Sequence, residues 1–174
     1  MAIRDVLAML TELEQNGVVE RYALGGAVAA TRYTSPAATE DVDVFVSFSG
    51  ASSTSPEPLK AIYDYLLARG GVADGAHIVV GGWPVQFLPA EEPLLAEALT
   101  QARNEDVDGI ATRVFTAEHV AAIALQLGRA KDKLRVEQMA REQVLDMKVF
   151  NQVLQRHGLV AKWDDFSTRY LDAP

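Results

Sequence analysis

Two aspartates open an apolar, strand-like run in this chain, and two adjacent glycines precede them. Gly25 and Gly26 lie in the segment LGGAVAA, and Asp41 and Asp43 belong to DVDVFVSF. Because side chains alternate along a strand, both aspartates point to the same face. Two carboxylates held that close repel each other and are costly to bury without a cation. The fold must therefore expose the pair as an ordinary polar strand face or provide positive charge beside it.

The composition indicates one folded domain. The chain has 174 residues, of which 49% are hydrophobic, so a full core is possible. It has no cysteine, which excludes disulfides, thiolate metal sites and a cysteine nucleophile. The opening segment MAIRDVLAMLTELEQ mixes acids into its apolar pattern, unlike a signal peptide, and no apolar run reaches the roughly 20 residues of a membrane span. We expect a cytoplasmic protein with no membrane partner.

The net charge of −8 is spread unevenly along the chain. Residues 1–110 carry 6 basic and 16 acidic side chains, whereas residues 111–174 carry 10 basic and 8 acidic ones. An acidic first half argues against simple electrostatic binding of nucleic acid there and suits a site that gathers divalent cations. For most of this charge, solubility is the simpler explanation.

Apolar periodicity predicts alternating helices and strands. The predicted strands are 21–24, 42–48, 77–80, 85–88 and 110–115, with a hairpin joining the third and fourth. The predicted helices are 3–15, 27–33, 59–69, 93–103, 117–127, 130–144, 146–157 and 163–170, with Thr116 and Asp164 as N-caps. This order predicts an α/β (α+β) fold with a small mixed sheet of about four or five strands flanked by helices and a helical C-terminal third. We expect residues 1–115 to form the α/β core and residues 116–174 a helical part packed on it.

The aspartate pair and the glycine pair together indicate phosphate chemistry. Mg²⁺ or Mn²⁺ beside Asp41 and Asp43 removes their repulsion, and Mg²⁺ typically takes one or two carboxylates plus substrate phosphate oxygens. Gly25 and Gly26 open a short predicted helix, where free N–H groups favour an anion and the missing Cβ lets a phosphate approach closely. No GxGxxG, P-loop, HExxH or G-x-S-x-G pattern is present. Phosphoryl or nucleotidyl transfer is therefore the reaction class that these residues favour.

Two motifs carry a resemblance to a known family. The pattern G-G, a spacer, then T-x-D-x-D, here Gly25, Gly26, Thr39, Asp41 and Asp43, resembles the signature of the DNA-polymerase-beta-type nucleotidyltransferase superfamily. Downstream, TAEHVAAIALQLGRAKD (116–132) resembles the helix-turn-helix of its toxin-type minimal members, those of abortive-infection and toxin–antitoxin systems. The resemblance spans residues 20–160.

The resemblance implies both a fold and an activity. The fold is that of a nucleotidyltransferase, and the activity is transfer of a nucleoside monophosphate from a nucleoside triphosphate to a hydroxyl of RNA, protein or a small molecule. Asp41 and Asp43 are then the catalytic, metal-binding carboxylates for Mg²⁺ or Mn²⁺. The residues implied in nucleotide and phosphate binding are Gly25, Gly26, Thr39, Arg129, Lys131 and Asp132. A toxin of this branch would also have a cognate antitoxin.

The chain departs from the family pattern at two glutamines. Gln86, within VQFLP, stands where active members usually have a third carboxylate, and a glutamine cannot act as a base. Gln126 stands where the helix before R-x-K-D often carries a lysine. Both changes remove a charge from the expected site. The alternative interpretation is therefore a catalytically weakened nucleotidyltransferase-fold protein that binds nucleotide or a partner protein.

Overall fold

A mixed β-sheet forms the centre of the fold in the computed structural model, which describes residues 3–35, 39, 41–50 and 57–172. Within these residues the sheet has seven strands in the order β3-β4-β5-β2-β1-β7-β6. The strands are β1 (Arg21–Leu24), β2 (Val42–Ser47), β3 (Val72–Asp74), β4 (His77–Val80), β5 (Trp83–Pro89), β6 (Arg103–Val107) and β7 (Ile110–Val114). The pairs β2–β5 and β1–β7 are parallel, and the other neighbours are antiparallel. The predicted α/β class is confirmed.

The sheet has seven strands, whereas the sequence predicted about four or five. The two missed strands, β3 and β6, are the outermost ones. All three residues of β3 are exposed, and Val107 is the one buried residue of β6. Edge strands with so little burial carry almost no apolar alternation, so periodicity does not reveal them. The helix predicted over 93–103 consequently ends at Thr100, because Arg103 already belongs to β6.

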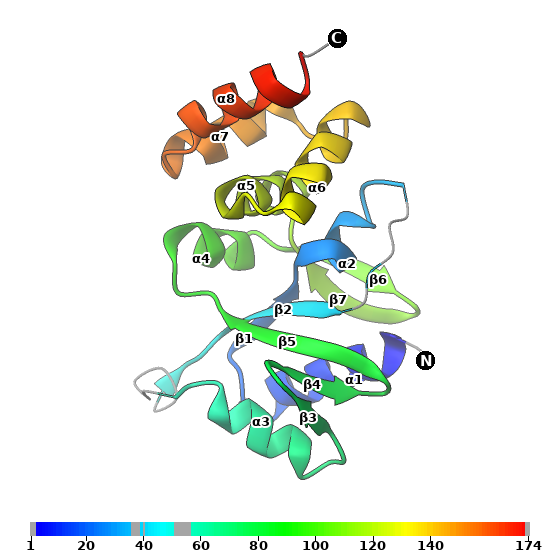
Figure 1. Ribbon diagram of the computed structural model, residues 1–174. Coiled ribbons are helices and arrows are strands. Elements are labelled where there is room, and N and C mark those ends of the chain that lie inside the picture. Colours follow the sequence, from blue (N-terminus) through cyan, green and yellow to red (C-terminus); the bar gives the residue numbers. More distant parts are fainter. Residues whose placement is uncertain (1–2, 36–38, 40, 51–56, 173–174) are drawn as a thin grey trace.

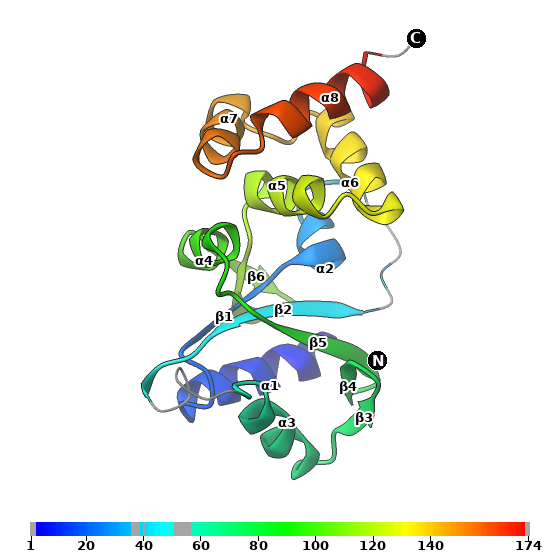
Figure 2. The ribbon, with the colours of Figure 1, turned by 60° about the vertical axis from the view of Figure 1, so that its left-hand side comes forward.

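Eight helices lie on both sides of this sheet within the described residues. They are α1 (Ile3–Gln15), α2 (Gly26–Ala30), α3 (Lys60–Leu67), α4 (Pro93–Thr100), α5 (Ala117–Leu127), α6 (Ala130–Arg141), α7 (Met147–Arg156) and α8 (Val160–Tyr170). Both ribbon views place α1 and α3 on one face and α2 and α4 on the other, with α5 to α8 stacked beyond α2 and α4 (Figures 1 and 2). Asp164 lies inside α8, so its predicted role as an N-cap was wrong. None of the described helices is both long and apolar enough to cross a bilayer.

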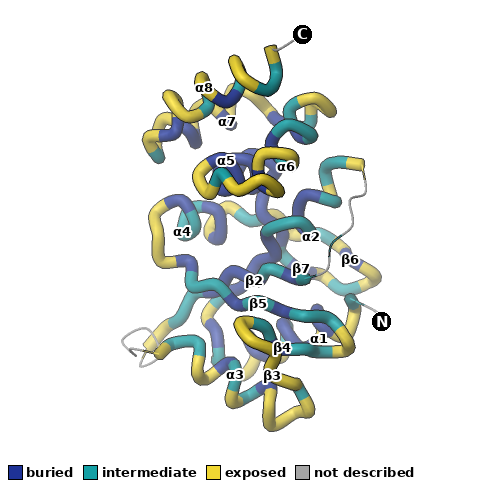
Figure 3. Tube along the Cα trace, viewed as in Figure 1, coloured by how far each residue is buried: buried dark blue, intermediate teal, exposed yellow. Residues whose placement is uncertain are grey.

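Helix α5 is the centre of the helical layer. Every residue from Ala117 to Leu125 is buried, as the dark tube in Figure 3 shows, and the helix contacts α2, α4, α6, α7 and α8. A helix that is buried all round belongs in the interior of a bundle. Thr116 caps its first turn as predicted, by accepting a hydrogen bond from the His119 N–H. Through α5, the position of the α5–α6 turn is fixed relative to the sheet.

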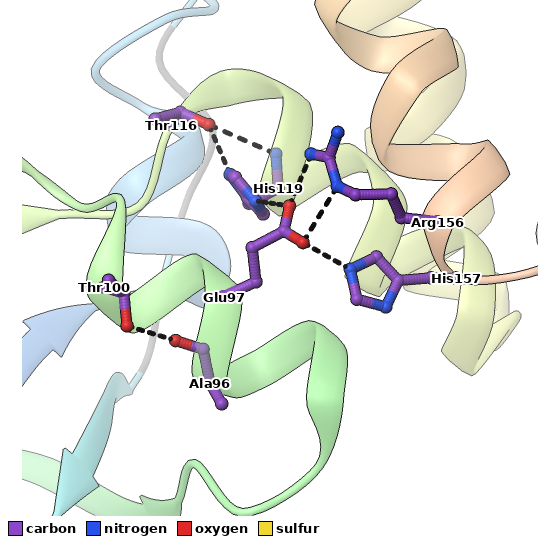
Figure 4. A network of polar contacts seen from close by, with 7 residues as sticks. All are labelled: Ala96, Glu97, Thr100, Thr116, His119, Arg156 and His157. Carbon is purple, nitrogen blue, oxygen red and sulfur yellow. Dashed lines mark hydrogen bonds and ion pairs between the residues drawn. The ribbon is translucent and has the colours of Figure 1, made fainter.

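A half-buried carboxylate joins α4 to α5 and α7. Glu97 of α4 accepts hydrogen bonds from Nε2 of His119 (3.0 Å) and of His157 (2.8 Å), and from Nε and Nη2 of Arg156 (Figure 4). These donors hold the pKa of Glu97 down to about 2, chiefly through the Arg156 hydrogen bonds. Burial lowers the pKa of His119, so its ring is neutral and its Nδ1 accepts from the Thr116 hydroxyl at 2.8 Å. The network therefore needs an ionised Glu97 and a neutral His119.

Lowering the pH should break this network of hydrogen bonds. The unfolded chain binds protons to His119 below about pH 6.5 and to Glu97 below about pH 4.5, whereas the folded chain resists both. The unfolding free energy should therefore fall as the pH drops below about 6.5, and Glu97 should account for at most about 3 kcal/mol of the loss as the pH falls from about 4.5 towards 2.

Denaturant melts across this pH range test the prediction on the parent and on Glu97→Gln. The variant should be less stable at pH 7 and should lose most of the dependence below pH 4.5. Glu137→Gln is the matched control, because Glu137 forms an i,i+4 pair with a largely exposed Arg141 and should change stability by less than about 1 kcal/mol. Parallel pH curves for the parent and Glu97→Gln would contradict the prediction.

Candidate active site

Four neighbouring elements bring polar or small residues into one row across the sheet. The parallel register of β2 and β5 pairs Asp43 with Gln86. On one side, the Gly25 N–H donates to the Asp43 carbonyl at 3.0 Å. On the other side, Ile78 of β4 pairs with Val85 of β5, so the antiparallel register carries His77 next to Gln86. The row therefore runs Gly25, Asp43, Gln86, His77.

Neither Gly25 nor Gly26 leaves room for a side chain. A Cβ on Gly25 would lie 2.3 Å from the Phe45 ring, which itself packs on Phe115. Gly26 has φ +56°, and a Cβ there would lie 1.9 Å from Oδ2 of Asp43 and 3.0 Å from its Cβ. Because the Asp43 Cβ is also close, rotation of the carboxylate alone cannot relieve the overlap. The backbone of Gly26 is thus the surface against which the Asp43 carboxylate packs.

A cavity of about 240 Å³ opens beside Asp43, between the sheet, α4, α5 and the start of α6. Gly26, Asp43 and Gln86 line it from the sheet side. Its other polar and charged lining residues are Glu92, Gln126, Arg129, Lys131, Asp132 and Arg135. Apolar side chains complete the lining, namely Phe45, Leu88, Leu95, Phe115, Val120, Ile123, Ala124 and Leu127. The cavity therefore offers apolar surface together with charges of both signs.

The charges around Asp43 act in opposite directions. Burial raises the pKa of Asp43 above its usual range, and the nearby Asp41 raises it further, whereas Lys131, Arg135 and Arg129 lower this pKa. These three cations come from the start of α6, far along the chain from Asp43, and they line the same cavity. A partly desolvated carboxylate that faces several cations is an arrangement able to bind a metal–phosphate complex.

Asp132 sets the position of two of these cations. Its side chain is fully buried, its Oδ2 accepts from Arg129 Nε at 2.6 Å, and its Oδ1 lies 3.5 Å from Arg135 Nη1. The Arg129 N–H also donates to Oδ2, which caps α6. Lys131 lies between the two arginines in sequence, and among the described residues it forms no ion pair. Lys131 is therefore the cation most open to a ligand.

Asp41 and Thr39 lie just before β2. The Asp41 side chain is 31% exposed, and its Oδ2 lies 3.8 Å from Nε2 of His77. It does not line the cavity, although it is close enough to Asp43 to raise the pKa of that carboxyl. The Thr39 hydroxyl donates to the Asp41 carbonyl at 2.8 Å, so Thr39 shapes the turn that carries Asp41.

From the sequence, Arg135 was left open between a nucleotide contact and a solvated helix face, and Glu92 and His77 were not predicted as site residues. Arg135 follows Lys131 by four residues, so it shares a helix face with Lys131, and this spacing was a usable signal. Glu92 and His77 carried no signal, because only tertiary packing brings them to the site.

A divalent cation here would have few protein ligands. In the part of the chain that the structure describes, no three His, Cys, Asp or Glu side chains converge closely enough to hold a metal ion. Two carboxylates of a partly exposed pair still suit Mg²⁺ or Mn²⁺, because these ions accept phosphate and water oxygens for their remaining positions. The donor set therefore fits a metal that arrives with a phosphorylated ligand.

Comparison with known proteins supports the fold. No protein-family model matches the chain, and no curated protein matches it. An antigenic nucleotidyltransferase-like protein from Paracoccidioides brasiliensis is 16% identical, with a TM-score of 0.51 over 93% of each chain. The antibiotic-resistance factor ANT(2'')-Ia, in its solution structure, is 10% identical, with a TM-score of 0.55 over 98% of each chain. The chain thus has the fold of nucleotidyltransferase-like proteins, and these low identities establish the fold alone.

The packing of Gly26 against Asp43 generates a stability prediction. Gly17 has a similar φ of +67° but nothing within 4 Å of an added Cβ, so Gly17→Ala isolates the cost of the left-handed backbone. We expect Gly17→Ala to cost about 1 kcal/mol and Gly26→Ala about 3 kcal/mol or more, because the latter also displaces Asp43. Denaturant melts of both variants measure the difference. Equal losses would show that Asp43 does not pack tightly on Gly26.

Proposed function

We propose that this chain is a metal-dependent nucleotidyltransferase, which moves a nucleoside monophosphate from a nucleoside triphosphate to an acceptor hydroxyl. The observation that carries the proposal is the position of Asp43. Its carboxylate packs on Gly26, lies near Asp41, and faces Lys131, Arg129 and Arg135 in one cavity. The nucleotidyltransferase-like fold agrees with this assignment.

Each side chain has a role in this proposal. Asp41 and Asp43 hold Mg²⁺ or Mn²⁺, which when bound neutralises the charge on phosphate oxygens. Gly25 and Gly26 lie beside the phosphates at the start of α2, and the missing side chain of Gly26 leaves room for the Asp43 carboxylate there. Lys131 and Arg129 stabilise the negative charge that develops on the leaving pyrophosphate, and Asp132 contributes by holding Arg129 in place.

The reaction itself is a single displacement. The acceptor oxygen forms a bond to the α-phosphorus, the bond from that phosphorus to pyrophosphate breaks, and the hydroxyl proton leaves to solvent. Arg135 adds a third cation on the phosphate side. The acceptor is RNA, a protein side chain or a small molecule. The resemblance of residues 116–132 leads us to include a toxin–antitoxin-type toxin, with a cognate antitoxin, in the proposal.

A second candidate function rests on Gln86. This residue pairs with Asp43 in the β2–β5 register, at the position where the family resemblance places a third carboxylate. A neutral amide cannot accept the hydroxyl proton, and no third acid converges with Asp41 and Asp43 among the described residues. The second candidate is therefore a catalytically weakened member of the fold that binds nucleotide or a partner protein.

Label transfer tests the proposed activity and separates the two candidates. The protein is incubated with each labelled nucleoside triphosphate, Mg²⁺ or Mn²⁺, and total cellular RNA, protein or small-molecule extract. The enzyme proposal predicts metal-dependent transfer of label to one acceptor fraction, and loss of transfer in Lys131→Ala. Metal-dependent binding of a triphosphate in calorimetry, without any transfer, would favour the second candidate. Absence of metal-dependent binding of ATP, GTP, CTP and UTP would contradict the enzyme proposal and the nucleotide-binding form of the second candidate.

The same assay on Gln86→Glu tests whether Gln86 stands at the position of a missing base. A carboxylate at this position should speed transfer by about 10²–10⁴-fold, the usual contribution of a general base. Gln86→Asn is the matched control, because it remains a neutral amide. A folded Gln86→Glu protein that binds nucleotide and transfers no faster than the parent would show that this position is not where a base acts.

A further inference from the structure

A second cavity, of about 80 Å³, lies where α8 packs beside α5 and α6 (Figures 1 and 2). Its lining includes three cations, one acid and two aromatic side chains, namely Lys133, Lys162, Arg169, Asp165, Phe166 and Tyr170. Lys131 and Arg135 line the cavity beside Asp43, whereas Lys133 lines this one, so the two cavities lie on different faces of α6. The second cavity is therefore a separate place for a ligand.

The acid in this lining does not cancel the positive charge. Oδ1 of Asp165 accepts a hydrogen bond from Nε of Arg169 at 2.8 Å, one turn further along α8, so these two charges offset each other. Lys133 and Lys162 form no ion pair with any acid among the described residues. The two lysines therefore give the cavity an excess of positive charge.

Unpaired lysines are concentrated around α6. Within residues 111–172, the basic side chains that pair with no described acid are Lys131, Lys133, Lys148 and Lys162. All of these except Lys148 line one of the two cavities. The chain carries 24 acidic and 16 basic side chains, so a shortage of acids does not explain why these lysines are unpaired.

Both lysines of the second cavity keep hydrogen-bond donors available. Nζ of Lys162 donates to the Gln126 carbonyl at 2.6 Å, at the C-terminal end of α5, where a cation is favourable. An ammonium group has three donors, so this contact leaves others for a ligand. Nζ of Lys133 lies 5.8 Å from the centroid of the Tyr170 ring, within the range of a cation–π contact. That contact engages no acceptor oxygen, so the Lys133 donors can also serve an anion.

A phosphate group fits this cavity in charge and in size. Two ammonium groups with available donors suit an anion that has several acceptor oxygens, and lysine is a common phosphate ligand. A volume of about 80 Å³ has room for one such group, whereas a site that encloses a drug-sized ligand measures roughly 300–1,000 Å³. The rest of the ligand would therefore stay outside, where the aromatic side chains of Phe166 and Tyr170 lie next to the cations, a combination that suits nucleic-acid bases.

We propose that this cavity binds a phosphate group, carried by a free nucleotide or by an RNA chain, through Lys133 and Lys162. The inference depends neither on a metal at Asp41 and Asp43 nor on the proposed function. Because the two cavities flank the first turns of α6, a phosphorylated ligand held here lies next to the cavity beside Asp43.

NMR titration of the full chain in chelator tests the inference without metal and without any measurement of activity. The probes are inorganic phosphate, ATP and a short single-stranded RNA. The amide signals of Phe166 and Tyr170, which line the second cavity and not the one beside Asp43, should shift. Lys133→Gln and Lys162→Gln should each weaken the affinity measured from these signals by about tenfold, the effect of losing one hydrogen bond to a charged group.

Two further variants serve as controls. Lys148→Gln removes the same charge from an exposed, unpaired lysine that lines neither cavity, so it should leave the affinity unchanged. Lys162→Arg keeps the charge and a donor for the Gln126 carbonyl, so it should retain most of the affinity. Melting temperatures confirm that all variants fold.

The RNA and nucleotide probes identify the source of the phosphate. For single strands, the logarithm of the affinity falls with the logarithm of the salt concentration by about 0.7 per phosphate contact, so Lys133→Gln should flatten this slope by about that amount. Tighter binding of RNA than of ATP would identify an RNA chain as the source. Equal or tighter binding of ATP would identify the free nucleotide.

The outcomes separate this inference from the proposed function. Signals of Phe166 and Tyr170 that stay in place with all three probes would overturn the inference. An equal loss of affinity in Lys148→Gln and Lys133→Gln would also overturn it, because binding would then follow the overall charge. Either result leaves the nucleotidyltransferase proposal standing, since label transfer tests that proposal separately.

Discussion

The partly buried carboxylate of Asp43 is the constraint on which the rest of the site depends. It sits in a central strand, next to a second acid, in a position that raises its pKa. Such a group is tolerated only if the surroundings accept its volume and offset its charge. Gly26 accepts the volume, because no side chain with a Cβ fits there. Lys131, Arg129 and Arg135 offset the charge from the opposite side of the cavity.

The helical layer holds in place the three cations that offset the charge of Asp43. Helix α5 is buried along nearly its whole length, and α6 follows it after the turn at Gly128. Asp132 is the buried anchor of that turn, since it caps α6 and pairs with two arginines. At the N-terminal end of α5, Glu97 joins α4 to α5 and α7 through two histidines and Arg156 (Figure 4). The sheet therefore supplies the acids and the helices supply the cations.

The sequence predicted the parts of the fold that have strong apolar periodicity. Helix α1 and strand β1 were predicted with their observed bounds, and the β4–β5 hairpin turns at Gly81 and Gly82 as expected. Edge strands β3 and β6 were missed because their residues are mostly exposed.

For the site, the sequence predicted which types of residue take part, but it predicted only some of the contacts between them. Gly26 was assigned to close approach of a phosphate, and the structure adds that the Asp43 carboxylate packs against it. Asp132 was grouped with the nucleotide-binding residues, and the structure places it beneath two arginines. The distance between His77 and Asp41 depends on strand pairing and has no signature in the sequence.

The central claim is that Asp43 serves to bind a metal and a phosphate, and that it lowers the stability of the protein when neither is bound. Thermal melts of the parent and Asp43→Asn, each in chelator and in Mg²⁺ or Mn²⁺ with a nucleoside triphosphate, test it most directly. The neutral amide removes the cost of burying a charge beside Asp41, so Asp43→Asn should melt at or above the parent temperature in chelator. It should also lose the rise in melting temperature that bound nucleotide gives the parent. A marked drop in chelator, with the nucleotide response intact, would mean that Asp43 is scaffold and would contradict this account.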